Sequence, residues 1–271
     1  MSESRVSGAG IPAGIRADIP HPARIYDYWL GGKDNFAADR DMAEYVLALV
    51  PEMIDYARGN RQFMVRAARL LANTGVTQFL DLGAGLPHSP NLHEIAQWTD
   101  PASRVVYVDN DPVVFLHAEA LMAQGRGTSV VRADLRDADD VLAQAGQALD
   151  LSQPVGLIFA ASLHHIEDID DPAGIVQRYA KALAPGSFLV LSHCTDEFNY
   201  DKIHEGSEDF RRRGGVFVPR SKDAIAAMFG GLIFLANRAW RVEGSTTVEQ
   251  MLAAFDRYAD QLTPALFGHW D

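Results

Sequence analysis

Residues 79–87 read Phe79-Leu80-Asp81-Leu82-Gly83-Ala84-Gly85-Leu86-Pro87. The apolar start predicts a short buried strand, the two glycines predict a sharp turn, and Ser89-Pro90 predicts the start of a helix behind the turn. Gly83 and Gly85 have no Cβ, so a ligand can lie against their backbone, and a following helix presents free N–H groups. We expect a nucleotide-type ligand here, although two glycines in such a turn can also serve packing alone.

Asp81, in the predicted strand, narrows the choice of ligand. A dinucleotide carries an anionic pyrophosphate, which this carboxylate would repel, and His88 stands where the dinucleotide motif has its third glycine. S-adenosylmethionine (SAM) has no phosphates and carries an ammonium and a sulfonium group. The turn therefore favours SAM over NAD.

Two more predicted strands end in aspartate. Residues 104–109 are an apolar run that ends in Asp109, and Asp111-Pro112 reads as the N-cap and first residue of the next helix. The spacing from Asp81 fits one β-α-β unit, and a carboxylate at this second strand end can accept both ribose hydroxyls. A third run, residues 129–133, is followed directly by Asp134.

The rest of the core repeats the same rhythm. Strands are predicted at 155–161 and 187–192, with a helix that begins at Pro172 between them. Alternating strands and helices give an α/β fold, a parallel sheet with helices on both faces. Ligands of such sheets bind at the carboxyl ends of the strands, so the residues just past each strand are the candidates for chemistry.

Several motifs resemble the class I SAM-dependent methyltransferases. They are D-L-G-A-G at 81–85, V-D-N-D-P at 108–112, A-D-L at 133–135 and L-H-H-I at 163–166. More narrowly, residues 23–40, Ala-Arg-Ile-Tyr-Asp-Tyr-Trp-Leu-Gly-Gly-Lys-Asp-Asn-Phe-Ala-Ala-Asp-Arg, are similar to the opening signature of an actinobacterial methyltransferase family first catalogued as a domain of unknown function.

This resemblance covers roughly residues 20 to 230 and implies a Rossmann-like class I methyltransferase sheet with SAM as the cofactor. The stretch at 133–135 matches the family's adenine-edge position, so the Asp134 carboxylate and the Leu135 backbone N–H are expected to read the adenine. The complete set of expected cofactor-binding residues is Asp81, Gly83, Ala84, Gly85, Asp109, Asn110, Asp134, Leu135, Ala160, Gly31 and Lys33.

The opening segment, Arg24 to Asp39, combines aromatic side chains with the pair Gly31-Gly32 and with Lys33. This mixture fits neither a helical stripe nor the alternation of a strand. A plain turn at the glycines is one interpretation. We expect instead that the segment contacts SAM or substrate and covers the ligand edge of the sheet.

Three histidines are candidates for catalysis: His164 and His165 after the fourth strand, and His193 after the fifth. A neutral imidazole could take the proton from an attacking O–H or N–H group. Histidines at strand ends are also often hydrogen-bonded walls of a pocket. A metal site of His165, His193 and Cys194 would lack any regular zinc spacing, so no metal is expected.

Composition limits the partners. A net charge of −12 argues against a nucleic-acid face, and the run Arg211–Arg213 reads as a solvated helix end or as an anion contact. The single cysteine excludes an internal disulfide and indicates a cytoplasmic protein. No apolar run reaches the ~20 residues of a membrane span. A homodimer is possible.

The expected organisation is one domain, residues 20–271, behind a disordered tail, residues 1–19. It comprises a helical cap at 20–75, the Rossmann-like core at 76–245 with a lid at 196–215, and a C-terminal helix at 246–271. Short closing strands are predicted at 232–235 and 239–242. The last helix begins at a capping box, Thr247 to Gln250, and packs onto this domain or onto a second copy.

These features predict a SAM-dependent methyltransferase that acts on a small molecule. Two alternatives remain at this point. One is a SAM-binding sensor or partner protein without catalysis, whose cofactor half would look the same. The other is an NAD-dependent oxidoreductase, which Asp81 and the missing third glycine disfavour.

Overall fold

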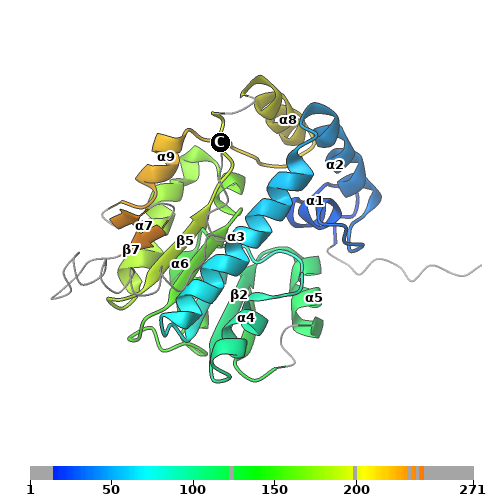
Figure 1. The fold of residues 1–271 in the computed structure, drawn as a ribbon. Coiled ribbons are helices and arrows are strands. Elements are labelled where there is room, and N and C mark those ends of the chain that lie inside the picture. The colour runs from blue at the N-terminus through cyan, green and yellow to red at the C-terminus, as the bar shows by residue number, and fades with distance from the viewer. Residues whose placement is uncertain (1–14, 122–124, 198–199, 231–232, 236–237, 241–271) are drawn as a thin grey trace, which may run out of the picture.

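The computed structural model of the chain describes residues 15–121, 125–197, 200–230, 233–235 and 238–240 (Figure 1). Within them a seven-stranded sheet has the order β3-β2-β1-β4-β5-β7-β6. The strands are β1 (Gln78–Leu82), β2 (Arg104–Asp109), β3 (Thr128–Arg132), β4 (Gly156–Ala160), β5 (Phe188–Ser192), β6 (Ile233–Leu235) and β7 (Arg238–Trp240). Neighbours among β1 to β5 pair in parallel, and β7 pairs antiparallel with both β5 and β6. The predicted α/β fold is confirmed.

Helices cover both faces of the sheet. The described helices are α1 (Pro22–Trp29), α2 (Ala37–Leu49), α3 (Met53–Asn73), α4 (Leu92–Thr99), α5 (Pro112–Leu121), α6 (Ala138–Ala145), α7 (Pro172–Ala182), α8 (Tyr200–Arg212) and α9 (Lys222–Ala227), with short 3-10 turns η1 (Leu163–His165) and η2 (Asp168–Asp170). Side chains alternate along β1, so Phe79 packs with α3 and α4 while Leu80 packs with α6 and α7. The two faces thus carry separate hydrophobic clusters.

A third hydrophobic cluster joins the opening helices to a distant part of the chain. Ile25 of α1, Met42 and Ala43 of α2, and Phe210 of α8 are buried together. Figure 1 shows α1, α2 and α8 gathered at one end of the sheet. The segment predicted as a lid contains α8, which packs on the opening helices.

One expectation about local structure was wrong. The helix after the glycine turn does not begin at Ser89-Pro90 but at Leu92, because Asn91 supplies the N-cap and its N–H donates to the Glu94 carboxylate. The opening segment shows no helical stripe in its sequence, and α1 nevertheless extends into it as far as Trp29. The buried face of α1 includes the charged residues Arg24 and Asp27, which have partners inside the protein. The sequence of α1 therefore lacks the hydrophobic spacing that is typical of a helix.

The prediction of a tail at 1–19 falls mostly on residues outside the described ones, and so does the C-terminal helix at 246–271. The division of the chain into tail, cap, core, lid and last helix stays a prediction. No helix in the described ranges is long and apolar enough to cross a membrane.

Candidate active site

The glycine turn after β1 has the backbone that only glycine adopts easily. Gly83 has φ +81° and Gly85 has φ +66°. A Cβ on Gly83 would lie 2.5 Å from the Cβ of Ser162, whereas a Cβ on Gly85 would meet nothing within 4 Å. The backbone N–H groups of Gly83 and Ala84 both donate to the Val108 carbonyl, at 2.9 and 3.1 Å. Gly83 therefore permits close packing, and Gly85 leaves open space beside the backbone.

Asp109, at the end of β2, is tied to this turn. One carboxylate oxygen accepts from the Gly85 N–H at 3.0 Å, and the other accepts from the Asp111 N–H at 2.9 Å. Burial raises the pKa of the Asp109 carboxyl. Each oxygen keeps a lone pair, so the carboxylate can still accept from two ribose hydroxyls. Asn110 follows it and is exposed.

Asp81 is buried beside the same turn, and the structure gives its carboxylate no hydrogen bond to any described residue. Burial raises its pKa to about 7, and the positive charge of Arg61 opposes this shift. A buried carboxylate without a donor is unfavourable unless a ligand supplies one. Asp81 is thus placed to receive a cationic group.

The expected adenine contacts lie past β3. The Asp134 carboxylate accepts from the Arg136 backbone N–H at 2.9 Å and from its guanidinium, which lowers the Asp134 pKa. The Leu135 side chain lies 3.7 Å from the position of a Cβ on Gly83. Ala160, at the end of β4, packs on the α3 side of the sheet. The structure brings these strand ends to one edge, and the adenine contact itself stays a prediction.

The opening segment reaches this edge at several points. The Asp27 carboxylate lies 3.2 Å from the His88 ring just beyond the glycine turn, and Asp34 lies 3.6 Å from His117 of α5. Burial would raise the pKa of Asp27, but hydrogen bonds from His88 and Asn35 bring it below its usual value. The segment therefore covers the start of α4 and α5.

Gly31 and Lys33, by contrast, are exposed in this segment, and the structure shows neither in contact with the strand ends. The neighbouring Gly32 packs tightly against Asp27, where a Cβ would lie 1.9 Å from the carboxylate. A role of Gly31 or Lys33 in cofactor binding stays a prediction.

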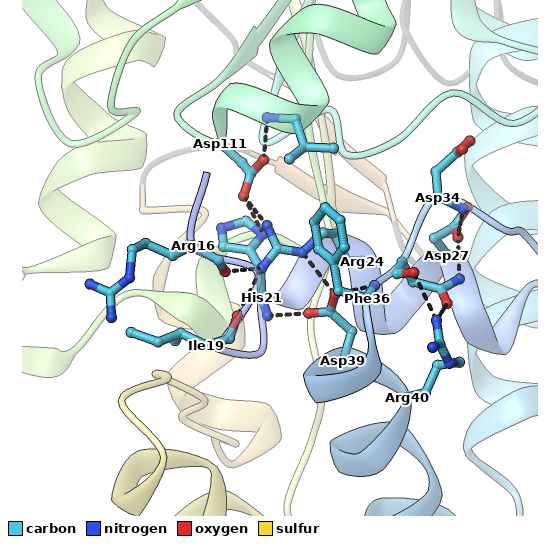
Figure 2. Close-up of polar contacts among 12 residues, drawn as sticks. Arg16, Ile19, His21, Arg24, Asp27, Asp34, Phe36, Asp39, Arg40 and Asp111 are labelled. Atoms are coloured by element: carbon cyan, nitrogen blue, oxygen red, sulfur yellow. Dashed lines mark hydrogen bonds and ion pairs between the residues drawn. The ribbon is translucent and has the colours of Figure 1, made fainter. Parts of the chain in front are cut away.

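A buried charged network fastens the opening segment to the core, and sequence reasoning missed it (Figure 2). The Arg24 guanidinium donates to Asp39 at 2.9 Å and to Asp111 at 3.0 Å, and both partners are buried. The prediction that Asp111 is the N-cap of α5 is confirmed, because its carboxylate accepts from the N–H groups of Val113 and Val114. The network thus reaches Asp109, which accepts from the Asp111 N–H.

The three histidines predicted for catalysis meet in one cluster. The centroid of the His164 ring lies 4.5 Å from that of the His165 ring and 5.3 Å from that of the His193 ring. The Phe217 ring packs on His164 and His165. Burial lowers all three pKa values, to about 4 for His165 and for His193. The imidazoles are therefore neutral at physiological pH.

Hydrogen bonds assign the tautomers of these rings. His193 accepts at Nε2 from Arg220 at 2.9 Å, so its Nδ1 carries the proton donated to the Cys194 carbonyl. His164 accepts at Nδ1 from the Cys194 N–H at 3.3 Å. His165 donates from Nδ1 to the Val216 carbonyl at 2.7 Å. Among the three, Nε2 of His165 keeps a lone pair without a donor in the described structure.

The histidine cluster and the glycine turn are connected through one short segment. Ser162, whose Cβ packs against Gly83, directly precedes η1, which contains His164 and His165. The Ser162 Oγ is buried and has no hydrogen-bond partner among the described residues. A ligand at the turn would therefore lie next to both an unpaired hydroxyl and the histidine cluster.

These residues fit SAM. Asp109 can accept from the ribose, Asp81 is a buried anion that awaits a cation, and Gly85 leaves the backbone open. A pyrophosphate would instead meet two buried carboxylates at the turn, which disfavours NAD.

Comparisons with known proteins agree with this geometry. The model of a family described as S-adenosyl methyltransferase matches residues 9–260. A crystal structure of a DUF574 family protein from Streptomyces avermitilis is 39% identical, with a TM-score of 0.78, over 82% of this chain and 87% of that one. A crystal structure of a candidate methyltransferase from Thermobifida fusca is 35% identical, also with a TM-score of 0.78, over 89% of this chain and 93% of that one. Among curated proteins there is no match.

The match spans most of the chain, which includes the opening segment and every strand end described above. It confirms the resemblance that the motifs indicated, and it decides between SAM and NAD in favour of SAM. The chain belongs to the S-adenosyl methyltransferase family and is a SAM-dependent methyltransferase.

Proposed function

We propose that this methyltransferase acts on a small molecule, which meets the cofactor beside the histidine cluster. The observation that supports a small acceptor is the cover over this edge of the sheet. Phe217 packs on the rings of His164 and His165, and Phe210 of α8 is buried with Ile25 of α1. A covered edge excludes water and suits an acceptor that can be enclosed.

In this proposal the chain aligns the reactants and manages one proton. Bound SAM supplies a methyl group that is already activated on its sulfonium sulfur. Asp109 orients the ribose, the cover excludes water, and Nε2 of His165 accepts the proton of an attacking O–H or N–H group. His193 has both ring nitrogens engaged, so it supports the cluster rather than taking the proton.

The charge of the protein supports the same choice of acceptor. A net charge of −12 disfavours a nucleic-acid partner, because binding to phosphates depends on clustered Lys and Arg. A cytoplasmic location and a homodimer remain predictions from the sequence.

The test is methyl transfer from radiolabelled SAM to separate panels of phenols, amines and carboxylic acids, with bulk RNA and protein as parallel acceptors. We expect label in a small molecule, with a rate that falls by about 10²–10⁴ in His165→Ala and much less in His193→Gln. Label that enters only RNA or protein would refute the small-molecule proposal. Equal losses in the two variants would refute the role of His165.

A further inference from the structure

Arg220 is a buried cation that joins the histidine cluster to the chain around it. It lies shortly before α9, and only 6% of the residue is exposed. Its backbone is bonded to the segment that follows β5, because its N–H donates to the Cys194 carbonyl and its carbonyl accepts from the Asp196 N–H, each at 3.2 Å. Arg220 is thus fixed to the chain next to His193.

The guanidinium of Arg220 clamps the turn η1, which carries His164 and His165. Nη1 donates to the Leu163 carbonyl at 3.1 Å, and Nη2 donates to the Ile166 carbonyl at 2.7 Å. These two carbonyls stand on either side of the two histidines in the chain. One side chain therefore holds the backbone of the turn at both of its ends.

The same guanidinium also binds one ring of the cluster and one carboxylate. Nη1 donates to Nε2 of His193 at 2.9 Å, and Nε and Nη2 donate to Asp168, at 3.0 and 2.7 Å. All five N–H donors of Arg220 thus have acceptors. While this arrangement is in place, Nε2 of His193 cannot take up a proton, because its lone pair is engaged and a cation faces it.

The charges around His193 decide whether the ring is neutral. Burial lowers its pKa to about 4, and the positive charge of Arg220 acts in the same direction, whereas Asp168 and Asp196 act in the opposite direction. The other titratable groups near the ring are uncharged, namely His164, His165 and Cys194. A proton on His193 would affect the reaction, since its positive charge would lower the pKa of His165.

We propose that Arg220 is a positioning residue of the methyl transfer, which keeps His193 uncharged and holds η1 in place so that Nε2 of His165 accepts the proton of the attacking group. The proposal rests on the role of His165 in the proposed function. Arg220 acts through the two histidines and does not itself contact the acceptor. The sequence pattern does not indicate this role, because Arg220 lies 27 positions beyond His193.

Arg220 could instead serve the stability of the fold alone, and the pH dependence separates the two roles. Loss of a structural clamp would reduce the rate by the same factor at every pH. Loss of the charge beside His193 would let this ring take up a proton as the pH falls. His165 would then become a poorer base, and the rate would fall with the pH.

The first measurement follows the protonation of His193 by NMR of the full chain with ¹⁵N-labelled histidine, with His193→Gln to assign the signal. In Arg220→Met the pKa of His193 should rise from about 4 toward the ~6.5 of an unperturbed histidine. Arg211→Met is the matched control, because Arg211 pairs with Glu167 of the same segment, at 3.8 Å and with both side chains exposed. This control should leave the titration of His193 as it is in the unmodified protein.

The second measurement is the rate of methyl transfer to the acceptor that the panel identifies. The rate of the unmodified protein should stay level from pH 8 to pH 6, whereas that of Arg220→Met should fall several-fold over this range, with the midpoint of the His193 titration. A rate that Arg220→Met lowers by the same factor at every pH would overturn the proposal. An unchanged titration of His193 in the folded variant would overturn it as well.

If Arg220→Met does not fold, Arg220→Gln takes its place, because its amide is uncharged and can still donate to a carbonyl. The same two outcomes then decide. Failure to methylate any small molecule would refute the proposed function, whereas the titration of His193 would still show whether Arg220 controls the charge of this ring. The two failures can therefore be told apart.

Discussion

Arg24→Met tests whether the buried charged network holds the opening segment on the core. The Arg24 side chain is 3% exposed, and it bridges Asp39 and Asp111, which are 0% and 4% exposed. Removing one partner of a buried ion pair typically reduces the free energy of unfolding by about 3–5 kcal/mol. Methionine keeps most of the length of the side chain, so the change isolates the charge and its hydrogen bonds.

The partners that remain set the magnitude at the lower end of this range. Asp39 still accepts from the N–H groups of His21 and Phe36, at 2.8 Å each, and Asp111 still caps α5. We therefore expect a loss of ~3 kcal/mol, which lowers the melting temperature by roughly 6–12 °C for a chain of this size. Because Asp111 adjoins Asp109, SAM affinity should fall as well.

Urea unfolding followed by circular dichroism measures the free energy, and calorimetry with S-adenosylhomocysteine measures the affinity. The control is Arg16→Ala, which removes an ion pair with Asp18 whose two side chains are 65% and 68% exposed. That exposed pair should contribute almost nothing to the free energy of unfolding. A loss below ~1 kcal/mol in Arg24→Met, or one equal to the control, would refute the idea that the network anchors the segment.

Three further predictions concern the cofactor. Asp109→Ala should weaken SAM binding by ~2–3 kcal/mol in calorimetry, and a folded variant with unchanged affinity would contradict the ribose assignment. Because Asp81 has a pKa of about 7 in the free protein and must be charged to hold an ammonium, S-adenosylhomocysteine affinity should fall about tenfold from pH 8 to pH 6. Asp81→Asn should bind more weakly and lose this pH dependence, and an unchanged dependence would point to another group. Asp134→Ala should discriminate less between SAM and its inosine analogue, whereas equal losses would mean a structural role.

The sequence by itself determined the parallel sheet, and it predicts where the cofactor binds. Each strand is a short apolar run bounded by Gly, Pro or Asp, and such local signals do not depend on the rest of the chain. β2 has the predicted bounds, and β1, β3, β4 and β5 lie within one residue of theirs. Once the strands are parallel, their carboxyl ends must share an edge, so Asp81, Asp109 and Asp134 could be placed together from their positions alone.

Only the tertiary structure decided what surrounds that edge. α1 shows no hydrophobic stripe in the sequence because Arg24 and Asp27 occupy its buried face, and a charged residue is rarely buried unless a partner meets it there. The partner of Arg24 lies 87 positions away, on the core. The proton positions of the histidines likewise depend on groups supplied by other segments, such as the Val216 carbonyl for His165 and Arg220 for His193. Hydrophobic periodicity records which face of a segment avoids water, but it carries no information about which charged groups will face each other after folding.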